Sequence, residues 1–157
     1  MGQGPHGHGP TGHVPSPLEL EIPSDVGYIE AAVAQVVIRC EAAGFDARHL
    51  AFHIPVALTE AVSNAILRGN REARDKSVRI RAALDGDALV VEVEDDGVGF
   101  DLEACTADPT TLDNLGREDG RGLFLMRRLM DRVEQFRGRG NVVRMTLLRR
   151  SSDDRAA

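Results

Sequence analysis

The chain has 157 residues, of which 42% are hydrophobic and 28% are charged, and 25 acidic against 19 basic side chains give a formal net charge of -6. This is the size and composition of one ordinary folded domain, and the acidic balance argues against direct binding of nucleic acid. No run approaches the roughly 20 consecutive apolar residues of a membrane span, and no charged and then apolar signal segment follows Met1. Because the two cysteines, Cys40 and Cys105, resemble neither a disulfide framework nor a zinc site, we expect a cytoplasmic protein without a membrane anchor.

Composition divides the chain into three parts. Residues 1–17 contain twelve Gly, Pro or His residues and few large apolar side chains, so we expect a disordered tail. Residues 18–150 carry the periodic apolar patterns of the expected domain. Residues 151–157 are polar and are expected to be a frayed tail.

The domain is expected to begin with a strand and a helix. Residues 18–22 alternate apolar with acidic side chains, which is typical of a half-buried strand, and residues 23–25 supply a break and a helix cap. Apolar residues recur every three or four positions from Ile29 to Cys40 and predict an amphipathic helix. Gly44 stands just past its last turn, as a C-terminal stop.

A second helix and a hairpin follow. Residues 47–67 have a helical pattern, in which Pro55 must either kink the helix or mark its true first turn. Residues 78–84 and 89–93 then alternate as two strands around the turn sequence Asp-Gly-Asp, which predicts a β-hairpin.

The last third of the chain starts with a long irregular segment. Residues 95–120 show no lasting period, and loops of this length inside a domain are usually lids or binding loops. We expect a third helix over 122–130 and a second strand pair at 132–137 and 142–148. This order of elements predicts an α+β domain with helices on one face of a mainly antiparallel sheet.

Glu60 and Asn64 are polar residues in an otherwise apolar stretch of the second helix. They lie four apart and therefore share one helix face. A carboxylate there can accept a proton from a hydroxyl or water, and an amide oxygen one turn on can complete a magnesium shell. Taken alone, the pair is more simply an exposed polar stripe.

Two glycine-containing segments are candidate ligand sites. Asp95-Asp96-Gly97-Val98-Gly99 follows the second hairpin strand, where glycines admit a ligand to the backbone and a carboxylate can accept an exocyclic amine. Gly120-Arg121-Gly122-Leu123 precedes the third expected helix, where backbone N–H groups can point at phosphate oxygens. Each segment is equally compatible with an ordinary turn or helix start.

Three segments in this order and spacing carry a family resemblance. They are VALTEAVSNAILRGN at 56–70, EDDGVGF at 94–100 and DGRGLFLMRRLMD at 119–131. Together they resemble the ATP-binding domain shared by gyrase, Hsp90, histidine kinases and MutL, and over residues 18–150 the chain is similar to the stand-alone anti-sigma factor serine kinases of bacterial partner-switching systems. The resemblance implies a two-layer α/β sandwich of the Bergerat type, with helices on one face of a mixed, mainly antiparallel sheet and an ATP lid.

The resemblance also implies roles for individual residues. Glu60 corresponds to the general base toward a protein serine hydroxyl, and Asn64 to the nucleotide-site residue that ligates the Mg²⁺ bridging the phosphates of ATP. Asp95 corresponds to the aspartate that recognises the adenine amino group. The remaining cofactor-binding positions form the adenine pocket at Gly97 and Gly99 and the phosphate side at Gly120, Arg121, Gly122 and Leu123.

The family implies a kinase that phosphorylates an anti-sigma-factor antagonist and, in its other state, sequesters a sigma factor; homodimer formation is a family expectation only. The sequence departs from the family where Arg68 and Asn70 replace a His and an aromatic residue, and where Asn141 replaces a Thr. These departures motivate an alternative, a non-catalytic ATP-binding switch module that regulates a protein partner. A third hypothesis is a detached sensor-kinase catalytic domain, which needs a separate histidine-bearing partner.

Overall fold

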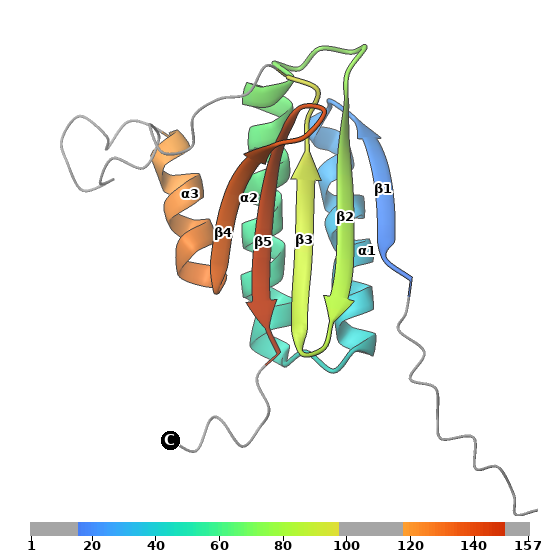
Figure 1. The fold of residues 1–157 in the computed structure, drawn as a ribbon, viewed down its shortest axis with the longest axis vertical. Coiled ribbons are helices and arrows are strands. Elements are labelled where there is room, and N and C mark those ends of the chain that lie inside the picture. The colour runs from blue at the N-terminus through green and yellow to red at the C-terminus, as the bar shows by residue number, and fades with distance from the viewer. Residues whose placement is uncertain (1–15, 98–117, 150–157) are drawn as a thin grey trace, which may run out of the picture.

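The structure is a computed structural model that describes residues 16–97 and 118–149, with residues 118–121 described by their backbone alone (Figure 1). Residues 1–15 of the tail expected at 1–17, the tail expected at 151–157, Gly99, and residues 98–117 of the expected lid segment lie outside the described residues.

One antiparallel sheet forms the first layer (Figure 1). Its strands, in the spatial order β1-β2-β3-β5-β4, are β1 (Leu18–Pro23), β2 (Ser77–Asp85), β3 (Ala88–Glu94), β5 (Asn141–Leu148) and β4 (Arg132–Arg137). The expected sheet was mixed and mainly antiparallel, whereas every strand pairing among the described residues is antiparallel. The predicted hairpin is confirmed, since Asp85 pairs with Ala88 and Gly86 takes the positive φ of 57° that a tight two-residue turn requires.

The second layer consists of helices on one face of this sheet (Figure 1). A short 3-10 turn, η1 (Val26–Tyr28), capped by the Asp25 side chain, leads into α1 (Ile29–Ala42). A single long helical run then contains η2 (His49–His53), α2 (Ile54–Asn64) and η3 (Ala65–Gly69), of which η2 and η3 are π-helical. Pro55 lies inside this run, where the π-helical turn η2 gives way to α2, so it does not mark the first turn of the helical run.

The third helix, α3 (Glu118–Leu129), begins four residues earlier than predicted. Gly120 and Gly122 therefore lie inside its first turns instead of before it. Glycine is a poor helix former, so the pattern alone favoured a later start. Tertiary packing overrides that preference, because α3 lies against α2 and buries Leu123, Met126 and Leu129 in the core.

The core lies between the two layers and includes the fully buried residues Val36, Leu58, Val62, Ile66, Ile80, Val91, Met126 and Met145. Among the described residues, the continuous run His49–Gly69 is the one helix long and apolar enough to cross a membrane by length and composition, and it contributes Leu58, Val62 and Ile66 to the core.

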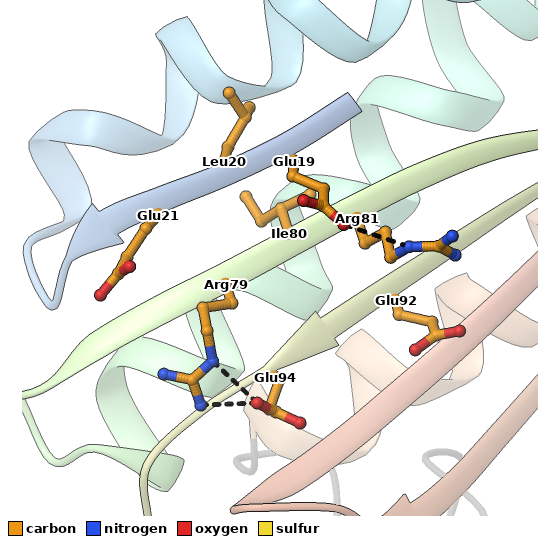
Figure 2. A pocket seen from close by; sticks show the side chains of 8 residues that line it. All are labelled: Glu19, Leu20, Glu21, Arg79, Ile80, Arg81, Glu92 and Glu94. Atoms are coloured by element: carbon orange, nitrogen blue, oxygen red, sulfur yellow. Dashed lines mark hydrogen bonds and ion pairs between the residues drawn. The ribbon is translucent and has the colours of Figure 1, made fainter. Parts of the chain in front are cut away.

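The opposite face of the sheet is charged and faces solvent. Across the five strands, Glu19, Arg81, Glu92, Arg144 and Glu134 stand in register with alternating sign. A hollow of about 430 Å³ on this face is lined by β1, β2 and β3, and Figure 2 shows Arg79 beside Glu94 and Arg81 beside Glu19. Arg79 lies 2.7 Å from Glu94 in this hollow, whose lining of four glutamates and two arginines has an excess of acidic side chains.

Candidate functional site

Glu60 and Asn64 lie together on the side of α2 that faces α3. Both side chains are half-buried, so the simpler interpretation of an exposed stripe is wrong. Gly122 of α3 packs directly against them: a Cβ added to it would lie 2.8 Å from Glu60 Oε2 and 3.3 Å from Asn64 Nδ2. The structure therefore brings three of the predicted site residues to one place, and the missing side chain at residue 122 makes that approach possible.

The same arrangement provides oxygen donors for a metal ion. Among the described residues no group of three or more His, Cys, Asp or Glu side chains gathers into a ready-made metal cluster. The donor set at Glu60 and Asn64 fits Mg²⁺, which is usually held by one or two protein oxygens while phosphates and water complete its octahedral shell.

Because α3 starts earlier than predicted, the predicted phosphate-side residues lie within the helix instead of before it. A helix leaves only its first four N–H groups without intrahelical partners, and Gly120 belongs to this first turn. Leu123 lies beyond it, and its side chain is 1% exposed and packs in the core. Leu123 therefore anchors α3 beneath the site.

Asp95 is a buried carboxylate at the end of β3. Its side chain is 1% exposed, and its Oδ1 accepts hydrogen bonds from the backbone N–H groups of Gly97 at 2.9 Å and Asn141 at 3.4 Å. Burial raises the pKa of Asp95 above its ordinary value, and these hydrogen bonds oppose that rise. Asp95 and Gly97, both predicted as site residues, are thus in direct contact.

Three glycines allow three distant segments to meet at Asp95. A Cβ on Gly69 would lie 2.0 Å from Asp95 Oδ2, one on Gly97 would lie 1.9 Å from the Gly69 carbonyl oxygen, and one on Gly140 would lie 1.8 Å from the Asp95 carbonyl oxygen. Sequence reasoning assigned only Gly97 to the site. Gly69 follows the helical pattern predicted over 47–67, and Gly140 lies between the strands predicted at 132–137 and 142–148, so neither was assigned to the site.

Polar residues around this point were also missed. Asp96 accepts a hydrogen bond from the Ser77 backbone at 3.0 Å and lies 2.8 Å from Arg79 Nη1, and these contacts lower the pKa of Asp96. Asn141, one of the departures from the family pattern, is buried beside Asp95 and accepts a hydrogen bond from Gln135. Arg68, another of the three departures, is exposed. The sequence signal available for these residues was polarity at the edge of a motif.

One continuous helical run connects the two halves of the site. Asn64 ends α2 and Gly69 ends η3, so about 7 Å of helix axis separates the residue beside Gly122 from the residue beside Asp95. Glu60, Asn64 and Gly69 therefore lie on one continuous helical run, and Asp95 packs against its last residue, Gly69.

Comparison with known proteins agrees with this geometry. Residues 22–147 match the model of the histidine kinase-like ATPase domain. The chain is 32% identical over 138 residues to the serine-protein kinase RsbW of Bacillus subtilis (strain 168). The aligned region covers 82% of this chain and 83% of that protein. It is 27% identical to the serine-protein kinase RsbW of a Listeria monocytogenes strain, with 82% and 85% covered, and 30% identical to the anti-sigma F factor of Clostridium beijerinckii, with 60% and 66% covered. The chain therefore belongs to the histidine kinase-like ATPase domain family.

Proposed function

We propose that the chain transfers the γ-phosphate of ATP to a serine or threonine of an anti-sigma-factor antagonist and, in its other state, sequesters a sigma factor in the cytoplasm. It is an ATP-dependent protein serine/threonine kinase with an anti-sigma role, in keeping with its similarity to the serine-protein kinases over most of its length. The observation that best supports the catalytic assignment is the packing of Glu60 and Asn64 against Gly122, on the helical run that ends beside Asp95.

Each residue has a distinct task in this proposal. The Asp95 carboxylate accepts a hydrogen bond from the exocyclic amine of adenine, and the three surrounding glycines let the segments that carry them pack closely around Asp95. Asn64 would ligate Mg²⁺, with Glu60 nearby. When bound, the metal ion neutralises phosphate charge and orients the γ-phosphate.

Glu60 is the general base. Its carboxylate takes the proton of the acceptor hydroxyl, whose oxygen forms the new bond to the γ-phosphorus while the bond to the bridging oxygen of ADP breaks. Phosphoryl transfer requires mainly positioning and charge neutralisation, so no covalent nucleophile on the enzyme is needed.

Replacing the base tests the proposal. Glu60→Gln keeps the shape of the side chain but removes its capacity to accept a proton, and we expect phosphotransfer to an antagonist protein to slow by about 10² to 10⁴. Calorimetric affinity for Mg-ATP should change little. Thr59→Ala, an exposed change on the same helix, is the matched control. A Glu60→Gln rate equal to that of the wild type would contradict the catalytic assignment, and ATP binding without turnover by the wild type would favour the non-catalytic switch.

A further inference from the structure

Asn70 follows directly after the long helical run and is 1% exposed. Its amide nitrogen donates to Ser24 Oγ and to the Ser77 carbonyl oxygen, each at 2.8 Å. Its amide oxygen accepts from the Asp96 backbone N–H at 2.7 Å. One buried side chain thus bonds to the chain beyond β1, to the start of β2 and to the end of β3.

The Asp96 contact differs in kind from the other two. Asp96 lies between Asp95, the proposed adenine-recognition residue, and Gly97, whose N–H bonds to the Asp95 carboxylate. Gly69, the residue before Asn70, is the one that contacts Asp95 Oδ2 and Gly97. Two consecutive residues at the end of the helical run therefore contact the segment that follows β3, Gly69 by close packing and Asn70 by a hydrogen bond.

The chemistry of this position explains why an amide stands there. The Asp96 N–H requires an acceptor and the Ser77 carbonyl requires a donor, and in part-buried surroundings a backbone group that loses its partner destabilises the fold. An asparagine side chain supplies both functions from one planar group. An apolar or singly functional side chain leaves at least one of these groups unsatisfied.

We propose that Asn70 is a positioning residue that sets the purine preference of the nucleotide site, by fixing the Asp95–Gly97 turn through the Asp96 N–H. This inference rests on the proposed function of Asp95. A carboxylate held in place accepts a bond from the 6-amino group of adenine and opposes the 6-oxo group of hypoxanthine, because two acceptors then face each other. A carboxylate free to shift can relieve that opposition, so selectivity falls.

The test compares ATP with inosine triphosphate, whose bases differ at C6. Calorimetric affinities of both nucleotides are measured for the full chain, for Asn70→Ala and for Ser24→Ala. We expect the wild type to prefer ATP by tenfold or more, which is the scale of one charge-assisted hydrogen bond. Asn70→Ala should lower the ratio of the two affinities by about tenfold. Ser24→Ala removes one partner of Asn70 while leaving the Asp96 contact in place, so it should keep the ratio.

The outcomes distinguish the role proposed for Asn70 from the adenine assignment of Asp95 on which it rests. A purely structural role lowers both affinities alike, so an unchanged ratio in Asn70→Ala overturns the role proposed for Asn70 and leaves the adenine site standing. A wild type that binds both nucleotides equally, or neither, overturns the adenine assignment of Asp95 and this inference with it. Thermal unfolding verifies that each variant is folded. If Asn70→Ala is not, Asn70→Ser, too short to reach the Asp96 N–H, is compared in the same way.

Discussion

Replacing Asp95 by asparagine is expected to weaken ATP binding while sparing the fold. The aspartate accepts hydrogen bonds at Oδ1 from Gly97 and Asn141, and in the proposed complex it also accepts from the adenine amine. An asparagine has one acceptor oxygen and one NH₂ group, so it turns a donor toward either the Gly97 N–H or the adenine amine. Losing a hydrogen bond to a charged group costs about 1.5–3 kcal/mol, which corresponds to roughly a 10- to 150-fold weaker affinity.

Relative to the wild type, the free energy of unfolding of Asp95→Asn should increase as the pH rises. Burial raises the pKa of Asp95 in the folded chain, so the folded state holds this proton more tightly than the unfolded state does. The stabilisation linked to that proton is present at acid pH and is lost as pH rises from the unfolded pKa through the raised folded value. Asp95→Asn carries no such charge, so its stability relative to the wild type should increase over this window and stay constant above it.

Two measurements test this pair of effects. Calorimetry with Mg-ATP gives the affinities of wild type and Asp95→Asn, and urea unfolding at several pH values gives their stabilities. Equal ATP affinities would refute the placement of adenine at Asp95. A variant that loses stability relative to the wild type as pH rises would refute the assignment of a raised pKa.

Two further predictions concern close packing and burial. Gly69→Ala places a Cβ 2.0 Å from Asp95 Oδ2, so we expect about 1–3 kcal/mol of lost stability and loss of ATP binding. The control Gly86→Ala is destabilised only through its positive φ, in open space, and should bind ATP like the wild type. Equal ATP affinities of the two variants would count against the proposed site. Burial raises the pKa of Cys40 from 9.0 to about 11. In a Cys105→Ser background at pH 8, the Cys40 thiol of the folded chain should therefore react with a disulfide reagent at least about 100-fold more slowly than that of the chain unfolded in urea. Equal rates would contradict the burial of Cys40.

Local pattern predicted most of the fold. The strands at 18–22, 78–84, 89–93, 132–137 and 142–148 appear in the structure with their ends shifted by at most one residue. Alternation of apolar and polar side chains specifies which face of a strand is buried, and this pattern depends only on residues that are adjacent in the sequence. The helix spacing of Glu60 and Asn64 is local in the same sense, so their shared face was predictable.

The start of α3 depended on a partner that the pattern does not contain. Two glycines near its beginning disfavour a helix when considered alone. In the folded chain, however, Gly122 is the position where α3 meets Glu60 and Asn64, and an added Cβ there would displace the Glu60 carboxylate. The approach of α2 compensates for the poor local propensity.

The sequence by itself determined the order of elements, the buried faces, and the motifs that mark Glu60, Asn64, Asp95 and Gly97. Only the tertiary structure decided that Gly69, Asn70 and Asn141 belong to the same site, and that Leu123 serves the core. Periodicity reports the surroundings of a residue within one element. Contact between residues as far apart as Asn70, Asp96 and Asn141 arises only when the sheet and the helices close on one another and bury polar groups that must then find partners.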